Sequence, residues 1–160
     1  MQLTVFNHSS STEIQDVLIR CVNIPSWVKA MDKMRPYKSK EALLDFAKTL
    51  AQNWTWQEIL GALNEHPKIG EKPKTENSYS NKEQEKISTK SQDKIALVQA
   101  NMAYENKFGF IFLIKAMGLS TSQVLTEIEL RLENNLDTEK KCVHEQLMLI
   151  TLLRLEQEIV

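Results

Sequence analysis

The sequence contains few residues that interrupt helices and few that form disulfides or metal sites. It has four glycines, four prolines and two cysteines in 160 residues. No apolar run approaches the roughly 18 residues that a membrane span needs. Cys21 and Cys142 have no partner at metal-ligand spacing, so we expect two buried thiols of a cytoplasmic protein and no metal site. The N-terminus lacks the basic and apolar pattern of a secretory signal, and we expect none.

An excess of charge of one sign is missing as well. The chain carries 20 basic and 21 acidic residues, which give a net charge of −1. Proteins that bind nucleic acid or an anionic membrane surface usually carry a basic face, so we expect neither partner. A chain of 160 residues is long enough to build one hydrophobic core, and we expect a single domain over residues 1–160.

Apolar residues recur at helical spacing wherever a period is clear, and no alternating strand pattern occurs. The predicted fold class is therefore all-α. Helices are expected near residues 14–21, 25–34, 39–54, 55–66, 80–108, 111–117, 120–134 and 138–157. Ser39, Thr55 and Ser120 stand where N-terminal caps are expected. The polar stretch 71–81 is expected to be a loop, either a lid over a site or a solvated connector.

The helix predicted over residues 80–108 has its expected buried stripe at Ile87, Ile95, Val98 and Met102. The start of this helix has two interpretations. Ser80 and Glu83 have capping-box spacing, in which each side chain bonds the backbone N–H of the other residue. Alternatively, Ser80, Glu83 and Gln84 form a polar cluster that faces a ligand at the positive end of the helix. The spacing does not decide between them.

The stretch His66-Pro67-Lys68-Ile69-Gly70 is the main candidate for a functional site. Pro67 cannot continue the helix that ends at His66, and Gly70 permits a turn that a larger residue would resist. A histidine fixed on such a corner suits general acid–base chemistry. The alternative is an ordinary helix end without a functional role, in which a C-terminal histidine is followed by a proline that stops the helix.

A second candidate lies after Gly109, which is expected to end one helix shortly before the next one begins. The first N–H groups of the helix predicted over residues 111–117, near Phe112 to Ile114, have no intrahelical partner. They can hold a substrate carbonyl or an anion. They can equally be capped by another part of the protein.

A third candidate is Arg154 in the last helix. Val143, Leu147 and Ile150 step along one face at helical spacing, and Arg154 occupies the next position on that stripe. A guanidinium that faces the core must be paired, because burying it alone is very costly. Its partner is either a protein carboxylate or an anionic ligand, whose geometry the planar guanidinium fits at two points.

Eight short motifs follow one another over nearly the whole chain. They are Trp27-Val28-Lys29-Ala30-Met31, Arg35-Pro36, His66-Pro67-Lys68-Ile69-Gly70, Ser80-Asn81-Lys82-Glu83-Gln84, Asn101-Met102-Ala103-Tyr104, Phe108-Gly109-Phe110, Arg131-Leu132-Glu133-Asn134 and Arg154-Leu155. This ordered set resembles the family of 2-oxo-4-hydroxy-4-carboxy-5-ureidoimidazoline (OHCU) decarboxylases, which act in urate degradation. The ordered set is more specific than the His-Pro corner alone.

The resemblance implies a compact all-α domain, often found as a homodimer, that needs no cofactor and converts its small-molecule substrate to (S)-allantoin. The catalytic positions that it implies are His66 and Glu83. The substrate-binding positions that it implies are Pro67, Ser80, Gln84, Phe112, Leu113, Ile114, Lys115, Ala116 and Arg154. In the family, the main chain of the region matched by Phe112 to Ala116 holds the substrate ring.

The resemblance also implies an arginine that holds the substrate carboxylate. Arg154 is our assignment, and Arg131 is the competing candidate because both precede a leucine. The stretch 71–81 lacks the glycines common there in the family. The alternative function is a catalytically inactive helical binding module on the same scaffold.

Overall fold

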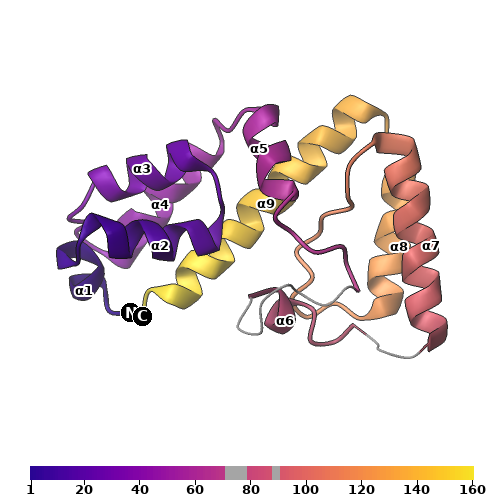
Figure 1. Cartoon of the computed structure of the whole chain (residues 1–160), viewed down its shortest axis with the longest axis horizontal. Coiled ribbons are helices and arrows are strands. Elements are labelled where there is room, and N and C mark those ends of the chain that lie inside the picture. Colours follow the sequence, from indigo (N-terminus) through magenta and orange to yellow (C-terminus); the bar gives the residue numbers. More distant parts are fainter. Residues whose placement is uncertain (71–78, 88–90) are drawn as a thin grey trace. The chain divides into compact units, whose positions relative to one another are not determined.

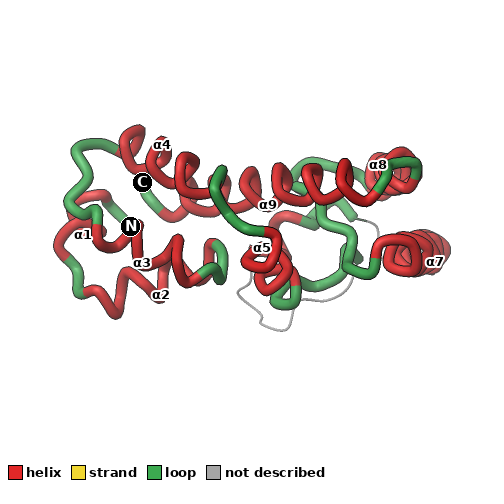
Figure 2. The backbone as a smooth tube through the Cα atoms, turned by 90° about the horizontal axis from the view of Figure 1, so that it is seen from above, coloured by secondary structure: helices red, strands yellow, loops and turns green. Residues whose placement is uncertain are grey.

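The computed structural model describes residues 1–70, 79–87 and 91–160. Within these residues the chain forms nine helices joined by loops, and no strand (Figure 2). The all-α prediction is therefore confirmed. The chain divides into two compact units, which we call the first unit (residues 1–62 and 148–160) and the second unit (residues 63–147). None of the described helices is long and apolar enough to cross a membrane.

The first unit is built from the N-terminal helices and the end of the last helix. Its helices are α1 (Leu3–His8), α2 (Ser11–Cys21), α3 (Pro25–Lys33), α4 (Lys40–Ala51), α5 (Trp56–Leu63, up to residue 62) and the last part of α9 (Leu136–Glu158). The predicted caps are present, since Ser39 accepts the Ala42 N–H at 3.0 Å and Thr55 accepts the Glu58 N–H at 3.2 Å. The sequence patterns do not predict α1, because six residues are too few to show a period.

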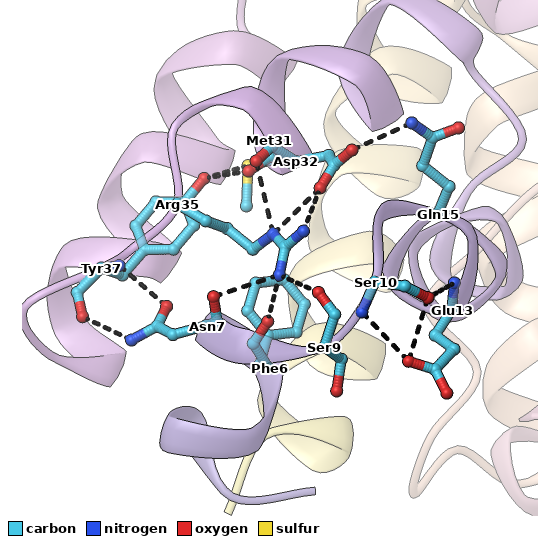
Figure 3. A network of polar contacts seen from close by, with 10 residues as sticks. All are labelled: Phe6, Asn7, Ser9, Ser10, Glu13, Gln15, Met31, Asp32, Arg35 and Tyr37. Atoms are coloured by element: carbon cyan, nitrogen blue, oxygen red, sulfur yellow. Dashed lines mark hydrogen bonds and ion pairs between the residues drawn. The ribbon is translucent and has the colours of Figure 1, made fainter.

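A half-buried arginine holds the end of α1 against the end of α3 in the first unit (Figure 3). Arg35 Nη1 donates to three carbonyl oxygens, those of Phe6 at 2.7 Å, Asn7 at 3.2 Å and Ser9 at 2.8 Å. The Nε and Nη2 atoms of Arg35 lie 2.9 and 2.7 Å from Asp32 Oδ1. One guanidinium thus satisfies a carboxylate and the carbonyls at the C-terminal end of α1, which have no partner within that helix.

The second unit surrounds a separate hydrophobic core. Its helices are α6 (Tyr79–Glu83), α7 (Ser91–Phe108), α8 (Thr121–Leu132) and the first part of α9, and α7 packs beside α8 (Figures 1 and 2). Ser120 caps α8 as predicted, accepting the Gln123 N–H at 3.3 Å. The buried core residues are Ile69, Ile87, Leu97, Tyr104, Phe108, Phe112, Ala116, Val124 and Ile128. This core joins the His-Pro corner, the turn after α6 and the chain between α7 and α8.

The single helix predicted over residues 80–108 is wrong. The short helix α6 ends at Glu83, the chain turns through residues 84–87, and α7 is a separate helix. Of the predicted stripe only Ile87 is buried, whereas three members are exposed, Ile95 by 57 %, Val98 by 50 % and Met102 by 56 %. The buried face of α7 consists of Leu97, Asn101, Tyr104 and Phe108. The prediction failed because it carried the helical phase from Ile87 across a break.

The helix predicted over residues 111–117 is wrong as well. Residues 111–116 form no helix, and they run within the connection that leads from the end of α7 to the start of α8 (Figure 1). Gly109 and Gly118 bracket this run with φ angles of +83° and +81°, a conformation that favours glycine. A run of seven residues is also too short to be helical without tertiary support. The N–H groups of Phe112 to Ile114 are therefore not those of a helix N-terminus.

Candidate functional site

The His-Pro corner follows directly on α5. The helix ends at Leu63, and the His66 N–H donates to the Leu63 carbonyl at 3.0 Å in the turn that comes next. His66 and Pro67 are both half-buried. The structure therefore places the histidine on a short turn rather than in the last turn of the helix.

Two side chains of α7 hold this corner in place. Asn101 Nδ2 donates to the Ile69 carbonyl at 3.0 Å, and this bond is buried. Lys68 Nζ lies 3.1 Å from Glu105 Oε2 in a partly exposed ion pair. Because Ile69 is itself buried in the core of the second unit, both the main chain and a side chain of the corner are fixed.

The corner is also bonded to the chain next to α6. The Gly70 N–H donates to Gln84 Oε1 at 2.9 Å. Glu83, the last residue of α6, is buried with 8 % of its surface exposed. The structure thus brings the segment that carries Glu83 and Gln84 against the segment that carries His66 and Pro67.

The bounds of α6 do not match the capping box predicted for Ser80 and Glu83, in which Ser80 would precede the helix. Helix α6 begins at Tyr79, so Ser80 lies inside the helix and Glu83 closes it. The side chain of Ser80 lies outside the described part of the chain, as do residues 71–78 of the predicted loop. The substrate-binding role of Ser80 and the lid therefore stay predictions.

Side chains of helices α8 and α9 form hydrogen bonds with the main chain between α7 and α8. Arg131 of α8 donates from Nη1 to the Leu113 carbonyl at 2.6 Å. Gln146 of α9 accepts the Lys115 N–H at 2.8 Å through Oε1. The Leu113 carbonyl and the Lys115 N–H thus have partners within the protein, and the predicted role of Lys115 in holding a ligand does not extend to its N–H.

The two candidate arginines have different surroundings. Arg131 Nε and Nη2 lie 2.7 and 2.5 Å from Glu139 Oε1, so its guanidinium is paired with a buried protein carboxylate. Arg154 is buried on the stripe where the sequence places it, and its Nη1 donates to the Cys21 carbonyl at 3.3 Å. Burial raises the pKa of the Cys21 thiol to about 12. The negative charge of Glu158 adds to this rise, and the positive charge of Arg154 opposes it. Cys21 is therefore a protonated core thiol at neutral pH.

The sequence patterns missed the buried network around Glu139. Its carboxylate also accepts from the Tyr104 hydroxyl at 2.5 Å and from Asn134 Nδ2 at 3.0 Å. A signal was present, because Arg131 continues the apolar stripe of Val124 and Ile128, the same spacing that singles out Arg154. Within the described residues no group of three His, Cys, Asp or Glu side chains lies together as a metal site.

We expect Gly70→Ala to destabilise the protein by at least about 1 kcal/mol. Gly70 has a φ of +88°, and an added Cβ would lie 2.9 Å from Leu97 Cδ1. Urea unfolding of the wild type and the variant measures the effect. Gly61→Ala is the matched control, because Gly61 lies in α5 with no atom within 4 Å of an added Cβ. This control should gain roughly 0.5–1 kcal/mol from helix propensity. Equal stability of Gly70→Ala and wild type would contradict the proposed rigidity of the corner.

The sequence matches those of known proteins. A protein-family model described as OHCU decarboxylase matches residues 7–156. A uric acid degradation bifunctional protein of Bacillus sp. (strain TB-90) is 28% identical over 98% of this chain and 32% of its own length. The uric acid degradation bifunctional protein TTL of Arabidopsis thaliana is 28% identical over 84% of this chain and 44% of its own length. The chain thus spans less than half the length of these curated relatives.

Solved structures match as well. The crystal structure of an OHCU decarboxylase in the presence of (S)-allantoin superposes with a TM-score of 0.73 and 25% identity, over 86% of this chain and 93% of that one. The crystal structure of an (S)-allantoin synthase superposes with a TM-score of 0.74 over 99% of this chain and 54% of that one, and its 17% identity supports the fold alone. Since the family model matches nearly all of the sequence, the chain belongs to the OHCU decarboxylase family.

Proposed function

We propose that this protein decarboxylates 2-oxo-4-hydroxy-4-carboxy-5-ureidoimidazoline to (S)-allantoin without a cofactor, in urate degradation. The observation that carries the proposal is the hydrogen bond from Gly70 to Gln84, because it sets the segment of Glu83 against the corner of His66. Membership in the OHCU decarboxylase family and the likeness to a structure determined with (S)-allantoin support this choice of substrate and product.

The chemistry fits the residue types present. Loss of CO₂ breaks the bond to the substrate carboxylate and leaves the electron pair on the conjugated ring. Main-chain N–H groups of Phe112 to Ala116 other than that of Lys115 would stabilise that charge as it forms, an effect typically worth about 3 kcal/mol for a well-placed donor. His66 and Glu83 would take up the hydroxyl proton and deliver a proton to one face of the ring, which sets the (S) configuration. Pro67, Ser80 and Gln84 would line the substrate.

We assign the substrate carboxylate to Arg154. Its guanidinium is buried on an apolar stripe, where its planar donors suit two-point binding of a carboxylate. The competing candidate, Arg131, has all three guanidinium nitrogens against Glu139 or the Leu113 carbonyl. The surroundings of Arg131 therefore favour Arg154 for this role.

The two units are proposed to act as one domain over residues 1–160. The family match runs through both units without interruption, from residue 7 to residue 156. The cytoplasmic location expected from two unpaired cysteines stays a prediction.

The first functional prediction concerns turnover. Fresh substrate, generated from urate by the two preceding enzymatic steps, should be converted to optically active allantoin faster than it decays spontaneously. Circular dichroism follows the appearance of the (S) product. Only slow, racemic allantoin at every protein concentration would contradict the decarboxylase proposal.

The same assay tests the alternative function, an inactive binding module. Such a module would be stabilised by (S)-allantoin through ligand binding, so its melting temperature would rise with allantoin concentration while turnover stayed absent. A rise in melting temperature together with turnover supports the enzyme.

The second functional prediction separates the roles of the site residues. His66→Ala and Glu83→Ala should each lower turnover by at least about 100-fold, the lower range for losing a positioned proton-transfer group. Arg154→Lys keeps the charge but loses the two-point geometry, so it should weaken substrate binding and turnover together. Steady-state kinetics on folded protein measures all three.

The exposed residues His8 and Glu85 provide matched controls for the two alanine variants. His8→Ala and Glu85→Ala should leave turnover unchanged. A Glu83→Ala protein that melts at a lower temperature but turns over normally would end the catalytic assignment of Glu83.

We further propose that the protein is a homodimer formed through the exposed stripe of α7, namely Ile95, Val98 and Met102. These side chains share one face of the helix, and each is at least half exposed. Lys94 and Glu105, whose carboxylate also pairs with Lys68 of the same chain, stand at opposite ends of the stripe, roughly 16 Å apart along the helix axis. Two antiparallel copies would bring Lys94 of one beside Glu105 of the other, so the face is complementary to itself.

We expect Val98→Glu to convert the dimer to a monomer, because it places a charge in the centre of the apolar contact. Analytical ultracentrifugation measures the change at a concentration where the wild type is dimeric. Ile19→Glu on α2 is the matched control, since Ile19 is also an exposed apolar residue on a helix, and it should leave the dimer intact. A monomeric wild type, or a dimeric Val98→Glu variant, would refute this interface.

A further inference from the structure

The main chain between α7 and α8 has no neighbouring strand within the described residues, so side chains take over the task of fixing it. Arg131 holds the Leu113 carbonyl at 2.6 Å, and Gln146 holds the Lys115 N–H at 2.8 Å. Phe112 and Ala116 are buried in the core of the second unit. The segment is thus fixed through both its side chains and its main chain.

The Arg131 side chain is itself held rigidly. Two of its nitrogens lie on Glu139 Oε1, at 2.7 and 2.5 Å, and its guanidinium carbon stands 4.4 Å from the centre of the Phe112 ring. Glu139 is completely buried. A buried ion pair is a weak source of stability compared with apolar packing, but it fixes the direction of both side chains. Arg131 is therefore oriented before any ligand binds.

The partners of Glu139 complete this arrangement. The Tyr104 hydroxyl donates to Oε1 at 2.5 Å, and Asn134 Nδ2 donates to Oε2 at 3.0 Å. Burial, followed by the bond to Glu139, raises the pKa of Tyr104, so the hydroxyl keeps its proton at neutral pH. Helices α7, α8 and α9 thus meet at one carboxylate.

We propose that Arg131 is a positioning residue for the decarboxylation. Glu139 orients its guanidinium, the guanidinium fixes the Leu113 carbonyl, and the main chain of residues 112–116 is thereby held where it binds the substrate ring. The proposal rests on the proposed function of that segment. It gives Arg131 a role distinct from carboxylate binding, because each of its guanidinium nitrogens already lies within 2.7 Å of a protein oxygen.

The first unit supplies a matched control for this role. Arg35 places Nε and Nη2 on one oxygen of Asp32 and Nη1 on main-chain carbonyls, the same pattern that Arg131 shows with Glu139 and Leu113 (Figure 3). Both arginine side chains are largely buried. A lysine at either position keeps the charge and loses the planar set of guanidinium donors, so the local structural cost of the two substitutions should be similar.

The experiment compares Arg131→Lys with Arg35→Lys at equal amounts of folded protein. We expect Arg131→Lys to lower kcat by roughly 10- to 100-fold, as misplacement of a binding group does, and to lower the enantiomeric excess of the allantoin. Arg35→Lys should leave both unchanged. A carboxylate-binding arginine would instead show its main effect in KM, with the enantiomeric excess preserved.

A second variant covers the case in which Arg131→Lys does not fold. Gln146 is only half-buried, and Gln146→Leu removes the other main-chain anchor of the same segment. It should lower kcat and enantiomeric excess in the same direction by a smaller factor. If both variants fold and both leave kcat and enantiomeric excess unchanged, the proposal is overturned. If Arg131→Lys does not fold, unchanged kcat and enantiomeric excess in Gln146→Leu overturn it.

Hydrogen exchange separates this proposal from the proposed function. Amides of residues 111–117 should exchange faster in Arg131→Lys than in wild type and in Arg35→Lys, whether or not the protein turns over OHCU. If the wild type shows no turnover but Arg131→Lys still exchanges faster over residues 111–117, the proposed function is refuted and the anchoring of the segment by Arg131 stands. Exchange that is equal in all three proteins would overturn the positioning role.

Discussion

The second unit depends on the hydrogen bonds and the ion pair that the buried carboxylate of Glu139 makes. Removing a carboxylate and a guanidinium from water costs several kcal/mol per ion, and excellent geometry with further hydrogen bonds is needed to offset that cost. Glu139 meets the condition with Arg131, Tyr104 and Asn134. Three helices are thereby tied to one point, and Arg131 extends the tie to the main chain at Leu113. A change at Glu139 therefore reaches the candidate site without touching it.

The two units solve the same problem in the same way. Each contains main-chain carbonyls that no helix satisfies, namely those at the C-terminal end of α1 in the first unit and that of Leu113 between α7 and α8 in the second. Arg35 supplies them to Phe6, Asn7 and Ser9, and Arg131 supplies one to Leu113. A guanidinium suits this task because its donors lie in a fixed plane, so a nearby carboxylate can orient it while the remaining nitrogen reaches the backbone. A lysine cannot do both at once.

Several segments of the candidate site are fixed by hydrogen bonds and by packing against the core. The corner of His66 is fixed by Asn101 on the Ile69 carbonyl and by Gln84 on the Gly70 N–H. Phe112 and Ala116 belong to the same hydrophobic core as Ile69. Proton transfer and charge stabilisation both need groups held to within a fraction of an ångström, and a rigid core beneath short non-helical segments provides that. His66, Pro67 and residues 112–116 therefore stand on loops, whereas Glu83 and Arg154 stand on helices α6 and α9.

The sequence by itself determined the all-α class, the caps at Ser39, Thr55 and Ser120, the buried stripe that ends at Arg154 and the family of the chain. These are local or ordered signals, because helical periodicity and capping act within a few residues. Only the tertiary structure decided that the chain breaks after Glu83, that residues 111–116 are not helical and that Arg131 belongs to Glu139 and Leu113. Residues 111–116 are held by bonds between residues far apart in sequence, since Leu113 and Arg131 are 18 residues apart and Lys115 and Gln146 are 31 apart. No pattern within one helix encodes which distant side chain will satisfy a main-chain group, because that choice is made when the helices pack.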